Sequence, residues 1–86
     1  MRITRTARFK RAWERLTEPE KEVARKALKN LENDISYPSL RVKKMKGTEQ
    51  VWEARANLSL RITFEIENGV IVLRNIGQHD EALDNP

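Results

Sequence analysis

The fold is decided by residues 58–76, which have the sequence LSLRITFEIENGVIVLRNI. Apolar and polar side chains alternate over Leu58–Ile66, and a period of two is typical of a strand with one buried face. Asn68-Gly69 then favours a two-residue hairpin turn. Residues 70–76 carry apolar side chains on both faces, as a strand near the centre of a sheet does. The segment therefore predicts an antiparallel hairpin.

A further strand is predicted over Val51–Ala56, immediately before this hairpin. Placing Arg55 opposite Arg61 gathers the apolar residues of both strands on one face, because opposed side chains of an antiparallel pair share a face. A slip of one residue would mix the faces, whereas a slip of two would preserve them, so the exact partners stay open. In this register the other face presents four polar side chains, which are Glu53, Arg55, Arg61 and Thr63.

The N-terminal half has helical periodicity. Residues 2–5 are compatible with a short strand, and apolar residues from Phe9 to Leu16 then recur at the spacing of one helical face. Thr17 and Glu20 have the spacing of a capping box, so a second helix is expected to begin there. Pro38 disfavours a helical conformation for the residue before it and marks the end of this helix.

The resulting order is β-α-α-β-β-β. It predicts an α+β fold in which the N-terminal strand and a helical hairpin pack on one face of a small, mainly antiparallel sheet. We expect the other sheet face to be open and the polar tail, residues 78–86, to be a loop.

Length and composition narrow the function classes. The chain has 86 residues, which suits one domain over residues 1–86. There is no cysteine and only one histidine, His79, so a thiolate or histidine-rich metal centre is excluded, and we expect neither a metal nor another cofactor. No apolar run reaches the length of a membrane span, and no secretory signal is visible, so we expect a cytoplasmic protein.

Positive charge is concentrated in one short segment. The formal net charge is +4, and Arg41, Lys43, Lys44 and Lys46 lie within six residues. Such a cluster favours a phosphate-bearing partner. The alternative is a solvated loop that keeps the protein soluble.

The polar sheet face could carry chemistry. Two neighbouring arginines repel one another, so Arg55 and Arg61 suit a site for an anion. The alternative is that Glu53 and Glu65 neutralise both arginines in an ordinary surface ladder. His79 is of the type best suited to proton transfer near neutral pH, although a lone histidine in a polar tail is more often only a surface residue.

The order and spacing of several short motifs resemble those of RelE-like toxins of type II toxin–antitoxin systems, in the RelE/ParE superfamily. The motifs span Tyr37–Gly47, Val51–Arg55, Leu60–Phe64 and Ile76–Glu81. The resemblance implies a ribosome-dependent messenger-RNA endonuclease. In such enzymes the 2′-hydroxyl attacks the adjacent phosphate without a metal, and a 2′,3′-cyclic phosphate results.

The resemblance also implies roles for individual residues. Arg61 matches a phosphate-stabilising arginine, Arg55 a basic position, and His79 a position that holds arginine or histidine. The working scheme has Glu53 or His79 as the base and His79 as the acid. The basic segment of Arg41, Lys43, Lys44 and Lys46 is expected to grip RNA or the ribosome. Leu83 departs from the pattern, since an aromatic residue is common there, and Glu53 occupies a position that is basic in some members.

Two alternatives come from the same superfamily. One is a ParE-like inhibitor of DNA gyrase, and the other is a catalytically degenerate module that only binds its antitoxin. The expected partners are a cognate antitoxin protein, messenger RNA and the ribosome. Operator DNA is expected only through the antitoxin complex, and no membrane partner is expected.

Overall fold

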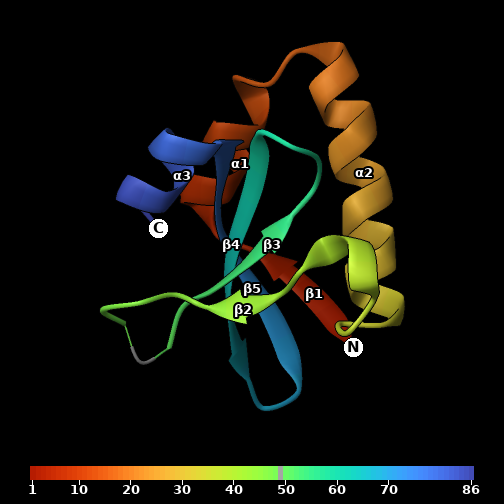
Figure 1. Ribbon diagram of the computed structural model, residues 1–86, viewed down its shortest axis with the longest axis vertical. Coiled ribbons are helices and arrows are strands. Elements are labelled where there is room, and N and C mark those ends of the chain that lie inside the picture. Colours follow the sequence, from red (N-terminus) through yellow and green to blue (C-terminus); the bar gives the residue numbers. More distant parts are fainter. Residues whose placement is uncertain (49) are drawn as a thin grey trace.

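The computed structural model describes residues 1–48 and 50–86, in which five strands form one sheet in the order β1-β5-β4-β3-β2 (Figure 1). β1 runs parallel to β5, and every other neighbouring pair is antiparallel. The α+β class and the mainly antiparallel sheet are therefore confirmed. The elements are β1 (Arg2–Arg5), α1 (Ala7–Glu14), α2 (Glu18–Asn33), the 3-10 turn η1 (Pro38–Leu40), β2 (Lys43–Lys44), β3 (Trp52–Arg55), β4 (Leu60–Glu67), β5 (Val70–Gln78) and α3 (His79–Asp84).

The register between β3 and β4 is the one that the apolar pattern predicts. Arg55 lies opposite Arg61 and Glu53 lies opposite Thr63. The alternation places Ala54, Ile62 and Phe64 on the other face, where all three are fully buried. The two-residue slip that the sequence left open does not occur.

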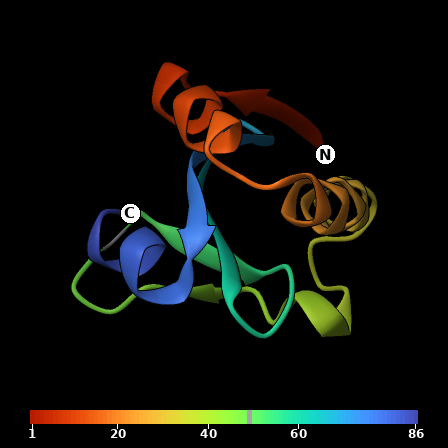
Figure 2. The same cartoon turned by 90° about the horizontal axis from the view of Figure 1, so that it is seen from above.

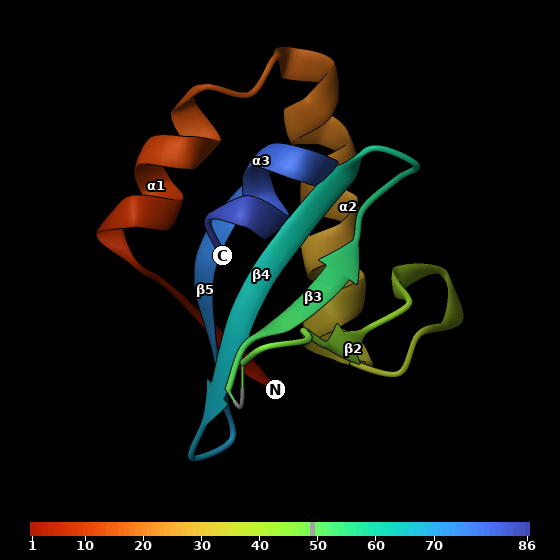
Figure 3. The same ribbon diagram turned by 60° about the vertical axis from the view of Figure 1, so that its left-hand side comes forward.

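The helical hairpin covers one face of the sheet, while α3 lies on the opposite face (Figure 2). Both helices of the hairpin turn their apolar stripes inward, as their spacing predicts. Phe9 of α1 and Leu31 of α2 have no exposed surface and join the buried residues of β4 and β5 in one core. The two helices diverge from their connecting loop, so part of the space between them is not filled by helix-to-helix packing (Figure 3).

Side-chain caps fix where both hairpin helices begin. The Thr6 hydroxyl accepts a hydrogen bond from the Phe9 amide and donates one to the Leu73 carbonyl, which ties the start of α1 to β5. Thr17 and Glu20 form the predicted capping box, in which each side chain accepts from the other residue's amide. These bonds satisfy backbone N–H groups that have no partner within the helix.

Two sequence predictions need correction. The tail is not a loop, because β5 continues to Gln78 and His79–Asp84 form α3. Helices this short are not stable alone, and α3 is held by packing, since Ala82 is completely buried. The polar face is consequently not fully open. In addition, Lys43–Lys44 form a two-residue strand that pairs with Trp52 and Glu53.

The capping box gives stability a dependence on pH. Its hydrogen bond from the Thr17 amide holds the pKa of Glu20 below the ordinary value of 4.5. Because the folded-state pKa is lowered, the stabilisation is complete above the unfolded-state value and is lost as the pH falls through the folded-state value. Glu20→Gln keeps an accepting oxygen but removes the charge at the helix N-terminus. We expect Glu20→Gln to lower the free energy of unfolding by about 0.5 kcal/mol at pH 7.

Urea denaturation at several pH values checks this expectation. The difference between wild type and Glu20→Gln should shrink as the pH falls below 4.5, where the wild-type carboxyl takes up a proton. A difference that stays constant down to pH 2 would contradict the assigned role of the charge.

Candidate functional site

The sheet face turned away from the hairpin carries two adjacent rows of side chains. One row crosses four strands and consists of Lys43, Glu53, Thr63 and Asn75. The next row consists of Arg55, Arg61 and Gly77. The β-sheet register thus places the predicted residues Glu53, Arg55 and Arg61 on one surface.

The two arginines have no carboxylate partner among the described residues. The acids expected to neutralise them pair with other cations: Glu53 contacts Lys43 at 3.4 Å, and Glu65 contacts Arg74 at 3.1 Å. Arg74 reaches this face through a bulge, because Thr63 pairs with Asn75 whereas Phe64 pairs with Leu73. The ordinary surface ladder considered above therefore does not form.

Arg61 is held in place by backbone carbonyls. Its Nη1 donates to the carbonyl oxygens of Asn57 at 2.8 Å and Leu60 at 3.2 Å. Burial and the nearby charge of Arg55 lower the pKa of Arg61, and Glu53 opposes this shift. An arginine guanidinium is effectively always protonated in proteins, so Arg61 stays cationic at neutral pH. A positioned cation with a repelling neighbour is suited to bind an anion.

Gly77 leaves space beside Arg61. Apart from its chain neighbours, none of the residues in 1–48 and 50–86 has an atom within 4 Å of the position that a Cβ would take at Gly77. The backbone of Gly77 does not have a positive φ, so glycine is not required there by the backbone conformation. The effect of the missing side chain is to leave space on the surface of the sheet. The row of Arg55, Arg61 and Gly77 therefore has unoccupied space at its Gly77 end.

His79 lies one alternation beyond Gly77, where β5 gives way to α3. Its amide donates to the Ser59 carbonyl at 2.7 Å, so its backbone is fixed to the turn that follows β3. The side chain is 54% exposed, and its Nδ1 lies 3.0 Å from Oδ1 of Asp80. The imidazole is thus accessible and has an adjacent carboxylate that can orient it.

Glu53 is more enclosed than His79. Its side chain is 11% exposed, and it lies between the Lys43 ammonium and Thr63. The segment after α3 covers the remainder of this row: the Pro86 carbonyl accepts from the Thr63 hydroxyl at 3.0 Å, and the Asn85 carbonyl accepts from the Asn75 amide at 2.7 Å. These contacts restrict access to the row that contains Glu53. The adjacent row, which contains Arg55 and Arg61, lies at the border of the covered area.

The basic segment does not form one uniform patch. Arg41, Lys43, Lys44 and Lys46 are all exposed, but Lys43 and Lys44 point to opposite faces because successive strand residues alternate. Lys43 contacts Glu53, whereas the Lys44 ammonium lies 5.4 Å from the centre of the Trp52 ring. Only Lys43 is thereby placed in the row next to the arginine pair.

Sequence reasoning missed three contributors to this surface. Asn57 closes the β3–β4 turn with its side chain and holds Arg61 with its carbonyl. Gly77 provides the space, and Asn75 anchors the covering segment. The Asn57-Leu58-Ser59 turn was the detectable signal, since asparagine is favoured in turns that it closes through its own side chain. Among the described residues, no three His, Cys, Asp or Glu side chains gather in a way that could hold a metal ion, and no helix is long and apolar enough to span a membrane.

Solved structures share this fold at low sequence identity. YafQ from Escherichia coli strain BL21(DE3) has a TM-score of 0.78 and 10% identity, over 94% of this chain and 97% of that one. RelE in a RelB–RelE antitoxin–toxin complex from Methanococcus jannaschii has a TM-score of 0.74 and 15% identity, over 90% and 91%. A YoeB/ParE toxin from Agrobacterium tumefaciens has a TM-score of 0.76 and 14% identity, over 92% and 99%. No protein-family model and no curated protein matches the sequence. The RelE-like fold that the sequence predicts is therefore confirmed.

The arginine pair should cost stability when no anion is present. Arg55→Gln removes the repulsion and breaks no ion pair among the described residues, so we expect the free energy of unfolding to be unchanged or to rise by up to about 1 kcal/mol. Arg74→Gln is the matched control. This substitution removes the contact between Arg74 and Glu65 and should therefore destabilise the fold. Urea denaturation in a low-salt buffer free of phosphate measures both. A loss of more than about 1 kcal/mol in Arg55→Gln would show that this arginine is structural.

Proposed function

We propose that this chain, acting as one domain over residues 1–86, is the toxin of a type II toxin–antitoxin pair and cuts messenger RNA on the ribosome in the cytoplasm. The observation that carries the proposal is the pair Arg55 and Arg61, which has no carboxylate partner among the residues that the structure describes and lies beside the open space at Gly77. The shared fold with solved RelE and YafQ structures supports the same conclusion.

The arginines act on the phosphate. The 2′-oxygen forms a bond to phosphorus while the bond to the 5′-oxygen breaks, and negative charge accumulates on the phosphoryl oxygens during this exchange. The two guanidinium groups stabilise that charge more than the charge of the ground state, and positioned cationic donors commonly give the largest contribution to catalysis of this kind. Arg61, held by two carbonyls, is the better fixed of the two.

Two groups move protons. Glu53 accepts the proton of the 2′-hydroxyl, and His79 gives a proton to the departing 5′-oxygen, so the products are a 2′,3′-cyclic phosphate and a 5′-hydroxyl. The accessibility of His79 and its contact with Asp80 support its role. Glu53 is enclosed, so in the variant of this scheme where His79 serves as the base, the protonated His79 passes that proton on to the departing 5′-oxygen, and Glu53 only balances Lys43. No metal or other cofactor takes part.

The exposed cations Arg41, Lys43, Lys44 and Lys46 hold the backbone of messenger RNA or of ribosomal RNA. A cognate antitoxin is the protein partner, a proposal supported by the antitoxin–toxin complex of the similar structure from Methanococcus jannaschii. Its acidic tail covers the polar sheet face and suppresses toxicity, and operator DNA is reached only through that complex.

A second candidate function is inhibition of DNA gyrase. It is favoured by Leu83, which stands in α3 where nuclease relatives commonly carry an aromatic side chain, and by the name of the similar YoeB/ParE toxin. The same fold serves both activities, so the fold alone does not separate them.

Induced expression in a test bacterium, with primer-extension mapping of cellular messenger RNA, tests the proposal. Wild type should arrest growth and produce cuts within translated codons. Arg61→Ala should abolish the cuts, and His79→Gln should slow them by about 10²- to 10⁴-fold, as expected for loss of a general acid. Arg11→Ala, an exposed arginine on α1, is the control and should cut like wild type. Growth arrest without cuts would support gyrase inhibition, and no arrest by a folded protein would support the degenerate binding module.

A further inference from the structure

A pocket of about 300 Å³ lies at the edge of the sheet, between α2, η1 and the end of β3. β2 pairs with Trp52 and Glu53 alone, so among the described residues no strand lies beside Arg55 on this side. Arg55 lines the pocket and also stands opposite Arg61 across β3 and β4. The pocket therefore adjoins the arginine pair.

The floor of the pocket is apolar and consists of small or buried side chains. Ala27 of α2 and Leu40 of η1 are buried, and Ala56, which follows β3, is half-buried. The two alanines leave room that longer side chains would fill. A volume of about 300 Å³ is at the lower end for pockets that bind small molecules, so it suits one ring system and not a segment of a protein.

Polar side chains surround this floor, and they have no partner in the part of the chain that the structure describes. They are Lys26, Asn30, Tyr37, Ser39 and Arg55. Within residues 1–48 and 50–86, none of these side chains forms a hydrogen bond or an ion pair. Glu22, one turn before Lys26, contacts Arg25 instead. A few polar groups that converge on an apolar pocket are the usual means by which a protein orients a small ligand.

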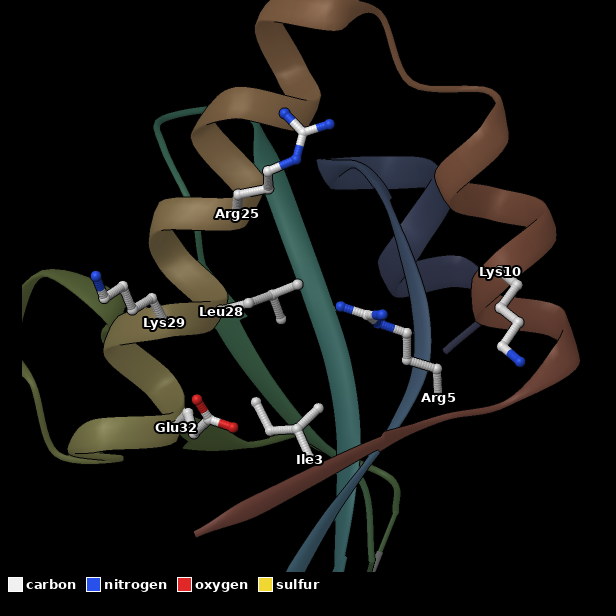
Figure 4. Close-up of a pocket in the computed structure, with 7 residues that line it drawn as sticks. All are labelled: Ile3, Arg5, Lys10, Arg25, Leu28, Lys29 and Glu32. Atoms are coloured by element: carbon white, nitrogen blue, oxygen red, sulfur yellow. The ribbon is translucent and has the colours of Figure 1, made fainter.

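The charge of the pocket is positive. Lys26 and Arg55 line it, and none of its described lining residues is a carboxylate. The larger cavity between α2 and β1 differs in this respect, because Glu32 lines it (Figure 4). A ligand suited to the pocket beside Arg55 therefore combines an aromatic ring for Tyr37, hydrogen-bonding edges and a negative charge, which is the composition of a nucleotide.

We infer that this pocket receives one unstacked nucleobase of the RNA strand whose phosphate lies between Arg55 and Arg61. The Tyr37 ring stacks on the base, as aromatic side chains commonly do with single-stranded RNA. The Asn30 amide donates one hydrogen bond to the edge of the base and accepts another. Adenine is the expected base, because its amino group and adjacent ring nitrogen match an asparagine amide. The pocket thus selects where the strand is cut, and the inference rests on the proposed function for the presence of that strand.

Tyr37 gives a direct signal for occupancy of the pocket, because it is the only tyrosine of the chain. The probes are four 2′-O-methyl dinucleotides, which cannot be cleaved and carry two adenines, two guanines, two cytosines or two uracils. An abasic dinucleotide and inorganic phosphate complete the set. Binding to the full chain is followed through the Tyr37 ring signals in ¹H–¹³C spectra and the arginine Nε–H signals in ¹H–¹⁵N spectra.

We expect the adenine dinucleotide to shift Tyr37 and Arg55 together and to bind about tenfold more tightly than the abasic probe. Inorganic phosphate and the abasic probe should shift Arg55 and leave Tyr37 in place. Tyr37→Ala should remove the advantage of the adenine dinucleotide, whereas Tyr37→Phe should keep its affinity within about twofold because the ring remains. Asn30→Ala should remove the preference for adenine over the other bases.

Lys10 supplies a control for the charge of the pocket. Lys26→Glu places a negative charge at the pocket and should weaken binding of the adenine dinucleotide by about tenfold. Lys10→Glu makes the same change of charge at the separate cavity of Figure 4 and should change the affinity by less than about twofold. Both lysines are exposed, so these variants decide the question if Tyr37→Ala fails to fold.

Shifts of Arg55 and Arg61 with Tyr37 unmoved by every base would overturn the inference and leave the phosphate site intact. Equal affinities for the adenine and abasic probes, or a preference for another base, would also overturn it. Because no probe is cleaved, binding is measured independently of nuclease activity. Adenine binding at Tyr37 in a chain that makes no cuts in cells would contradict the proposed function and not the pocket.

Discussion

Ala54 faces Ile62 and Trp52 faces Phe64 across β3 and β4, and this pairing determines where the polar side chains of the sheet can lie. Burial of the apolar partners beneath the helical hairpin excludes a slip of one residue, because such a slip would turn the arginines into the core. The same register places Arg55 beside Arg61 and Gly77 at the end of their row. The candidate site is thus a consequence of core packing on the opposite side of the sheet.

The candidate site lowers the stability of the fold, because the positive charges of Arg55 and Arg61 repel one another. Within the described part of the chain, Lys43 pairs with Glu53 and Arg74 pairs with Glu65, so neither of these carboxylates neutralises the arginine pair, which keeps its positive charge in a partly buried place. Stability would be better served by neutral residues, and such a conflict between stability and local charge is common where a protein binds a ligand. Carbonyls of the β3–β4 turn hold Arg61 against this repulsion.

The elements with strong periodicity could be predicted, and those held by tertiary contacts could not. The Thr17–Glu20 capping box, the Asn68-Gly69 turn and the β3–β4 register follow from local chemistry and apolar alternation. The short helix α3 is stabilised by the burial of Ala82, and the sequence of six residues is too short to show a helical period that predicts this packing. The two-residue strand β2 exists only through its pairing with β3. Arg55 and Arg61 were found together because of the register, whereas the space at Gly77 required the structure.

The central claim is that Arg55 and Arg61 together hold a phosphate. The most direct measurement is a titration of the folded chain with a 2′-O-methyl dinucleotide, which cannot be cleaved, followed through the arginine Nε–H signals in ¹H–¹⁵N spectra. The account predicts that the signals of Arg55 and Arg61 shift together and saturate at one concentration, while that of Arg74, which is paired with Glu65, stays in place. Shifts confined to other arginines, with Arg55 and Arg61 unchanged, would contradict it.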